Sequence, residues 1–95
     1  MNPTITIAMP CRNASETLGE AVASIRSQTF EDWELLIFDD GSTDDSPAVA
    51  AAYAAQDPRI RVIVSPHVGI VEALRQTCAL AESPFIARMD ADDVA

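Results

Sequence analysis

The stretch that decides the fold is WELLIFDDGSTDDSP, residues 33–47. Its opening run, Trp33–Phe38, is too continuously apolar for a strand with one face in water and is typical of a parallel strand buried on both faces. Gly41 provides the bend that follows, the Ser, Thr and Asp residues after it favour a helix start, and Pro47 is tolerated in a first helical turn. The stretch therefore predicts a buried strand, a turn and a helix, in that order.

Strands and helices alternate along the rest of the chain. Upstream, the β-branched and apolar residues Thr4–Met9 predict a strand that Pro10 ends, and a helix follows it. Downstream, the predicted elements are the Ala-rich helix to Gln56, a strand at Ile60–Val64, a helix from about Gly69 to Glu82, and a strand at Phe85–Met89. Four strands connected by three helices predict an α/β fold with a parallel sheet and right-handed crossovers.

Helical spacing predicts the buried face of the last helix. The apolar residues that recur at this spacing, and are therefore expected to face inward, are Val71, Leu74, Cys78 and Ala81.

Cys11 and Cys78 are expected to be small buried groups rather than nucleophiles, because the pattern places no histidine beside them. They also lack the spacing of metal ligands, so a reduced, cytosolic chain fits best.

The composition limits the classes of partner. The chain has 95 residues, is 48% hydrophobic, and carries 15 acidic against 6 basic side chains, for a formal net charge of −9. It is at most one small domain, or a part of a larger one, and it is too apolar for a disordered acidic tail. An acidic surface repels polyanions, which argues against a nucleic acid or an anionic membrane surface as partner. No apolar run approaches the roughly 20 residues that span a bilayer, and no basic segment typical of a signal peptide opens the sequence.

Three polar segments directly follow the first, second and fourth predicted strands. They are Pro10–Asn13, Asp39–Ser42 and Asp90–Asp93. The carboxyl ends of parallel strands lie along one edge of a sheet, where ligands bind, so these segments are expected to converge on one crevice. For the two acidic segments to flank the first strand, the strand order must be 3-2-1-4.

The cluster of Asp90, Asp92 and Asp93 is the sharpest chemical signal. Three carboxylates within four residues repel one another, and a bound Mg²⁺ or Mn²⁺ would remove that cost. The alternative is a solvated acidic turn that caps a following helix.

Two further features have more than one interpretation. Three interpretations are open for Asp39 and Asp40. They are a second pair of metal ligands, a site that binds the N–H groups of a base, or a turn without other chemistry. Arg75 either contacts a nucleotide or bridges to Glu72, three positions earlier on the same helix. His67 is a lone loop histidine without an assigned role. The sequence contains no Gly-x-Gly-x-x-Gly after the first strand and no Walker Gly-Lys-Ser/Thr, so a dinucleotide-binding Rossmann domain and a P-loop NTPase are disfavoured.

From Thr4 to Asp93, the chain resembles the family 2 glycosyltransferases, which are inverting enzymes of the GT-A fold. The likeness rests on segments that occur in order at the family's usual spacings: Pro10 with Asn13, then residues 24–30 (SIRSQTF), 33–44 (WELLIFDDGSTD), 57–62 (DPRIRV) and 87–93 (ARMDADD). One departure is His67, which stands two positions ahead of Gly69 where the family usually carries an asparagine. The order and spacing together make the resemblance specific.

The resemblance implies a nucleotide-binding role for several residues. Asp40 would contact the base, Asp39 stands beside it in the same motif, and the backbone near Pro10 and Asn13 would help to hold the nucleoside. Arg75 matches a position that reaches the base or the diphosphate in some members of the family.

The resemblance also implies a metal site. Asp90 and Asp92 are the acids of the family's D-x-D motif, with Asp90 assigned to the nucleotide. Asp92, helped by Asp93, would bind a divalent metal ion, Mg²⁺ or Mn²⁺, on the diphosphate of the donor.

The implied function is transfer of a sugar from a nucleoside-diphosphate donor, most simply a UDP-sugar, to a glycan, lipid or other hydroxyl acceptor with inversion. Residues 1–95 are interpreted as the N-terminal, nucleotide-sugar-binding half of a GT-A domain, truncated after the D-x-D motif. The general base and the acceptor surface are expected after Ala95. The piece alone is therefore expected not to transfer sugar, and to self-associate through its truncated face. The parent protein is expected in the cytoplasm or at the inner face of a membrane.

The alternative function is a non-catalytic, Mg²⁺-binding α/β module such as a receiver-like signalling domain. A receiver needs an aspartate after its third strand and a later lysine. Here Ser65 and Pro66 follow that strand, and the sequence contains no lysine. These features favour the enzyme.

Overall fold

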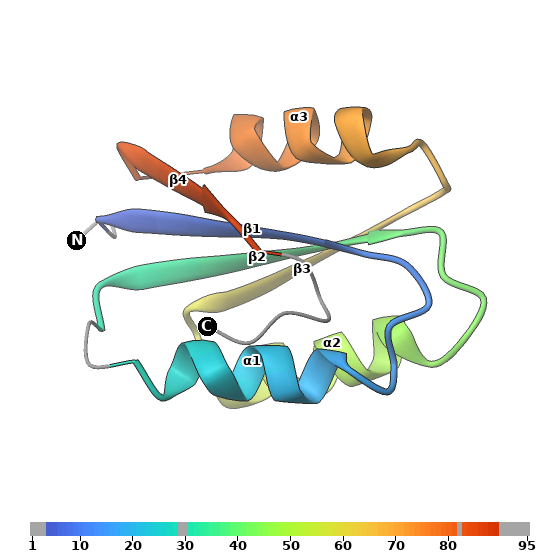
Figure 1. Ribbon diagram of the computed structural model, residues 1–95, viewed down its shortest axis with the longest axis horizontal. Helices are drawn as coiled ribbons and strands as arrows, with labels where there is room; N and C mark the ends of the chain where they lie inside the picture. The colour runs from blue at the N-terminus through green and yellow to red at the C-terminus, as the bar shows by residue number, and fades with distance from the viewer. Residues whose placement is uncertain (1–3, 29–30, 82, 90–95) are drawn as a thin grey trace.

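The computed structural model describes residues 4–28, 31–81 and 83–89, in which strands and helices alternate (Figure 1). The elements are β1 (Ile5–Cys11), α1 (Leu18–Arg26), β2 (Trp33–Asp40), α2 (Ser46–Gln56), β3 (Ile60–Ser65), α3 (Ile70–Leu80) and β4 (Phe85–Arg88). The alternation confirms the α/β class predicted from the sequence. Within these residues, no helix is long and apolar enough to cross a membrane.

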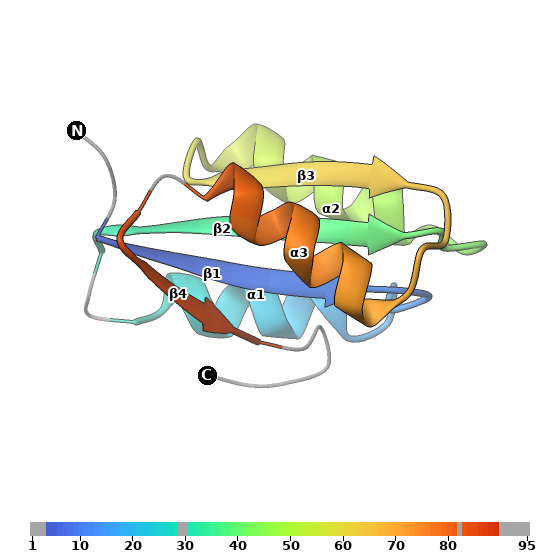
Figure 2. The same cartoon turned by 90° about the horizontal axis from the view of Figure 1, so that it is seen from above.

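The strands form a parallel sheet in the order β3-β2-β1-β4, which confirms the predicted order (Figure 2). The register pairs Cys11 at the end of β1 with Asp39 in β2, and Asp40 with Ser65 at the end of β3. The two inner strands, β1 and β2, are the ones with the longest apolar runs, as strands with neighbours on both sides require. The register therefore brings the polar ends of β1, β2 and β3 to one edge.

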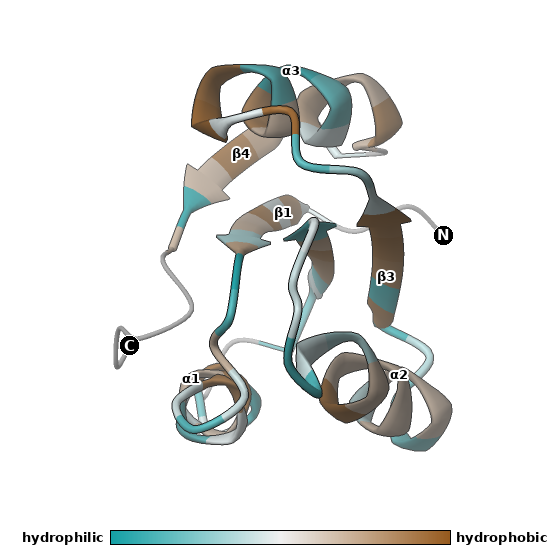
Figure 3. Ribbon diagram, turned by 90° about the vertical axis from the view of Figure 1, so that its right-hand side faces the viewer, coloured by the Kyte–Doolittle hydropathy of each residue, from teal (hydrophilic) through white to brown (hydrophobic). Residues whose placement is uncertain are grey.

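One face of the sheet is covered by α1 and α2 (Figure 3). Side chains alternate along a strand, and the odd-numbered residues of β1 and β2 point to this face. Its buried cluster consists of Met9, Cys11, Leu18, Ala21, Val22, Ile25, Trp33, Leu35, Ile37, Ala50 and Ile60. Most of these side chains have almost no contact with solvent, so this layer is the main hydrophobic core.

The other face is covered by α3, which packs through small residues. Its buried residues are Ala73 and Thr77, whereas Val71 is 79% exposed and Cys78 is exposed. The predicted inward position was therefore wrong for Val71 and Cys78. Both stripes follow helical spacing, but the one that is buried against the sheet carries the smaller side chains of Ala73 and Thr77. Thr77 satisfies its hydroxyl by donating to the Ala73 carbonyl 2.8 Å away within the helix.

An ion pair between Arg59 and Asp57 lies at the other edge of the sheet, where the strands begin. Arg59 donates to both carboxylate oxygens of the buried Asp57, at 3.0 and 2.8 Å, and its guanidinium lies 3.9 Å from the centre of the Trp33 ring. These hydrogen bonds lower the pKa of Asp57. A bidentate ion pair that also stacks on an aromatic ring is geometrically specific. The segment DPR at residues 57–59 therefore has a structural role.

Candidate functional site

The loops after β1 and β2 are joined by hydrogen bonds at the carboxyl edge of the sheet. Asn13 accepts from the backbone N–H of Thr43 at 2.8 Å through its Oδ1, and its own N–H donates to Ser42 Oγ at 2.9 Å. Asn13 has a positive φ of 54°, a conformation that asparagine adopts more readily than most residues. Two of the three segments predicted to converge therefore do so, and Asn13 joins them; the third, Asp90–Asp93, lies outside the described residues.

Asp44 organises the start of α2 within this junction. Its carboxylate accepts from the backbone N–H and the hydroxyl of Ser46, at 2.9 and 2.6 Å, and from the N–H of Ser15. Ser46 in turn accepts from the N–H of Ala14 at 2.8 Å. Hydrogen bonds from Ser46 lower the pKa of Asp44 to about 2. The carboxylate is therefore charged in the folded protein at neutral pH.

Asp39 is buried and closes the turn after β2. It accepts from the N–H and the hydroxyl of Ser42, at 3.2 and 2.5 Å, and from the thiol of Cys11 at 3.6 Å. Burial and the neighbouring Asp39 carboxylate raise the pKa of Cys11 to about 12. Cys11 is thus a thiol at neutral pH, in line with its predicted role as a small buried group.

Asp40 holds the loop that leads into α3. Its Oδ1 accepts from the N–H of Val68 at 2.6 Å and its Oδ2 from the N–H of Gly69 at 3.1 Å. The same Oδ2 lies 3.1 Å from Nδ1 of His67. We call these contacts the Asp40 clamp. The clamp ties the end of β2 to a segment almost 30 residues away in the sequence.

Gly41 allows the clamp to form. It has a φ of +72°, and a Cβ placed on it would lie 2.6 Å from the backbone nitrogen of His67. Any other residue would therefore be strained and would also collide with backbone atoms. The glycine predicted from the sequence as a bend is also the point of closest approach between the β2 and α3 loops.

An open pocket of about 220 Å³ lies beside the clamp. It is lined by Pro10, Cys11, Arg12, Asp40, His67 and Ile70. This volume is below the roughly 300–1,000 Å³ of pockets that bury a drug-sized ligand, so it can bury only part of a sugar nucleotide. Two of the predicted residues, Pro10 and Asp40, line it, whereas Asn13 and Asp39 shape the surrounding turns.

Arg75 is the one described site residue that the structure leaves apart from the others. It extends from α3 into solvent and donates to Glu72 at 3.0 Å, which is the bridging alternative considered from the sequence. Asp90, Asp92 and Asp93 lie outside the described residues. In the described part of the chain, no three His, Cys, Asp or Glu side chains gather as metal ligands, so Asp39 and Asp40 do not belong to a described metal cluster.

Sequence reasoning missed His67 and Arg12. The rule that located the other segments also applies to the loop after β3, because the carboxyl end of β3 lies at the same edge as those of β1 and β2. That rule would have selected Ser65–His67 as a fourth converging segment. Arg12 stands inside the first of these segments but was assigned no role.

Comparisons with known proteins agree on one family. The family model described as "Glycosyl transferase family 2" matches residues 6–95. The chain is 35% identical over 94 residues to the putative glycosyltransferase EpsE of Bacillus subtilis, covering 97% of this chain and 34% of EpsE. It therefore spans about a third of the length of that relative.

Solved structures show the same fold. The mannosyltransferase PcManGT from Pyrobaculum calidifontis, in complex with GDP-Man and Mn²⁺, matches with a TM-score of 0.84 at 22% identity, covering 99% of this chain and 29% of that one. TarS 1–349 from S. aureus, in complex with UDP-GlcNAc, matches with a TM-score of 0.81 at 23% identity, covering 96% of this chain and 27% of that one. These neighbours share the fold of the described sheet and helices.

Proposed function

The chain belongs to glycosyl transferase family 2, and from this premise we propose that it binds the nucleoside diphosphate of a sugar donor at the carboxyl edge of the sheet. The pocket lined by Asp40 would hold the nucleoside, and the diphosphate would extend towards the carboxyl end of β4. The family assignment favours a glycosyltransferase over the receiver-like signalling module considered from the sequence. In support, the relatives are glycosyltransferases, and the solved neighbours PcManGT and TarS bind GDP-Man and UDP-GlcNAc.

The hydrogen bonds of Asp40 are the observation that carries the proposal. An ionised carboxylate has about four lone-pair positions. Among the described residues, Oδ1 accepts from Val68 alone, whereas Oδ2 faces both Gly69 and His67. One acceptor position therefore remains on Oδ1, on a carboxylate that lines the pocket and is held in one orientation. This position suits the ring N–H of uracil, and guanine offers a similar N–H.

Other predicted residues would support the nucleoside without contacting the base. Asn13 and Asp39 keep the two loops in place, and Pro10 provides part of the pocket wall. Arg75 would enter the site only by giving up its bond to Glu72, and we assign it a contact with the base or the diphosphate.

The metal site is proposed from its donor set. Asp92 and Asp93 would hold a divalent ion and Asp90 would contact the nucleotide, because carboxylate oxygens are ligands that Mg²⁺ and Mn²⁺ prefer. When bound, such an ion stabilises the negative charge that develops on the departing diphosphate.

The chain spans only about a third of the length of relatives such as EpsE. We therefore propose sugar transfer for the whole protein rather than for this chain alone. The donor would be a UDP-sugar, the acceptor a hydroxyl of a glycan or lipid, and the transfer would invert the sugar's configuration. That reaction needs a general base to take the acceptor's proton. None of the described pocket residues is assigned this task, so the chain by itself is proposed not to transfer sugar. Its cytoplasmic or membrane-peripheral location and its self-association stay predictions.

Calorimetric titration of the chain with UDP, with and without Mn²⁺, tests the proposal. We expect binding that strengthens with Mn²⁺, and we expect the Asp92→Asn variant to lose the metal-dependent part. Asp45→Asn is the matched control, because Asp45 is an exposed acid whose side chain makes no capping bond. Equal affinity after chelation would remove Asp92 from the metal site, and absence of any nucleotide binding would contradict the proposal.

A further inference from the structure

His67 lies in the pocket wall, and the function proposed above gives it no task. Its Nδ1 lies 3.1 Å from Oδ2 of Asp40 and 3.3 Å from the backbone oxygen of the same residue. Both of these oxygens are acceptors when the carboxylate is ionised, so Nδ1 carries a proton and donates. This fixes the tautomer of the neutral ring, in which the other nitrogen, Nε2, is an acceptor.

The second ring nitrogen changes its hydrogen-bonding character when the ring gains a proton. Nε2 accepts while the ring is neutral and donates once the ring is protonated. The side chain of His67 is 54% exposed and lines the pocket. A ligand that contacts Nε2 would meet an acceptor while the ring is neutral and a donor once it is protonated, beside the carboxylate of Asp40.

Uracil and guanine differ in what they present beside the ring N–H that Asp40 would bind. In uracil this N–H has a carbonyl oxygen on both sides. In guanine it has a carbonyl on one side and an amino group, which is a donor, on the other. An acceptor next to Asp40 suits the guanine amino group and repels a uracil carbonyl, whereas a donor suits the uracil carbonyl.

We propose that His67 is a second base-reading residue, whose protonation shifts the preference of the pocket from guanine towards uracil. The inference rests on the proposed function, in which a nucleoside lies beside Asp40. Among the described residues, Arg12 is a charged group that lines the same pocket. Asp39 is bound to Ser42, and Glu72 in the first turn of α3 is paired with Arg75. Asp40 is the group that faces the His67 ring directly.

The test compares UDP and GDP rather than measuring either alone. Both ligands carry the same diphosphate, so attraction between a charged ring and the phosphates cancels in the ratio of their dissociation constants. For the full chain, we expect the ratio of the UDP constant to the GDP constant to fall about fivefold between about pH 8 and pH 5.5, the size of one net hydrogen bond. In His67→Asn and His67→Gln, which keep a side-chain donor for Asp40 but do not titrate, the ratio should not change with pH. Thermal melting of each variant at both pH values checks that it is folded.

The outcomes separate the inference from the function it rests on. A ratio that changes with pH in the unmodified chain and is constant in both variants supports the inference. A constant ratio in the unmodified chain, with both nucleotides bound, overturns it and leaves the proposed function standing. An equal change in the variants also overturns it, because another group would then be responsible. Failure of both nucleotides to bind overturns the proposed function, and this inference with it.

Discussion

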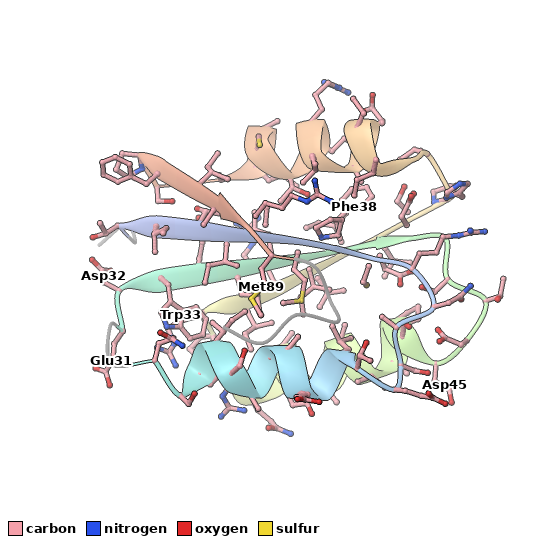
Figure 4. All side chains as sticks on the ribbon, viewed as in Figure 1. Glu31, Asp32, Trp33, Phe38, Asp45 and Met89 are labelled. Carbon is pink, nitrogen blue, oxygen red and sulfur yellow. The ribbon has the colours of Figure 1, made fainter. Side chains whose placement is uncertain are left out.

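Ile37 and Phe38 are consecutive residues of β2, yet their side chains enter layers of different character. Ile37 joins Met9, Leu35 and the buried residues of α1 and α2 in the hydrophobic core. Phe38 is equally buried on the opposite face, and Figure 4 shows it on the side of α3, with Trp33 on the side of α1. The first face is closed and apolar along most of its length.

The α3 face is mixed. At the amino edge, the buried Glu34 accepts from Thr6 at 2.6 Å and from Arg61 at 3.5 Å. At the carboxyl edge, the Asp40 clamp borders the pocket, and on α3 itself Val71 remains 79% exposed. Stability is therefore concentrated on the α1/α2 face, and the groups that can recognise a ligand are on the α3 face.

The same substitution on each face should give the largest contrast. Leu35→Ala removes a fully buried side chain of the closed face and should lower the free energy of unfolding by about 2–5 kcal/mol, enough to unfold a marginal domain. Leu80→Ala removes a side chain that is 41% exposed at the end of α3, and should cost less than about 1 kcal/mol. Urea denaturation measures both. Equal losses would mean that the α3 face is as well packed as the other.

Two glycines sharpen the comparison at the carboxyl edge of the α3 face. Both Gly41 and Gly69 have positive φ, but an added Cβ meets the His67 backbone at Gly41 and open space at Gly69. Gly69→Ala should cost about 1–3 kcal/mol of backbone strain. Gly41→Ala should cost more by roughly 1–3 kcal/mol of overpacking, and should also weaken nucleotide binding. Similar melting temperatures for the two variants would contradict the close contact between these loops.

Asp40→Asn breaks the clamp without changing the size of the side chain. An amide keeps one oxygen, so either Val68 or Gly69 loses its acceptor and faces an NH₂ group instead. We expect a loss of about 1–3 kcal/mol in unfolding free energy together with weaker nucleotide binding. The control, Asp45→Asn, removes the same charge from an exposed acid and should stay within about 0.5 kcal/mol. Unchanged stability in Asp40→Asn would show that the clamp does not hold α3.

The smallest expected effect concerns acid at the start of α2, on the closed face. The folded state lowers the pKa of Asp44 from 3.8 to about 2, which means that folding favours its charged form. Its stabilising contribution is therefore fully present above about pH 4 and is lost as the pH falls towards 2. Asp44→Asn should flatten the pH dependence of stability in this interval, as followed by circular dichroism. A variant whose stability falls as steeply as that of the unmodified chain would rule out this role.

Much of the fold could be predicted because it depends on local chemistry. The run Trp33–Phe38 is read as a buried strand from its own side chains, and the order of strands followed from the position of acids at strand ends. The inward face of α3 could not be predicted in the same way. Val71 and Ala73 both belong to stripes at helical spacing, and only the packing of the helix on the sheet shows which stripe is buried.

The candidate site divides along the same line. The sequence by itself determined that Pro10–Asn13 and Asp39–Ser42 meet at one edge, because parallel strands place their carboxyl ends together. It did not distinguish the roles of the two adjacent aspartates. Asp39 accepts hydrogen bonds within the turn that follows it, whereas Asp40 accepts hydrogen bonds from the segment that follows β3. Only the tertiary structure decided this, and brought His67 to Asp40, because what a carboxylate does depends on the donors that distant parts of the chain place around it.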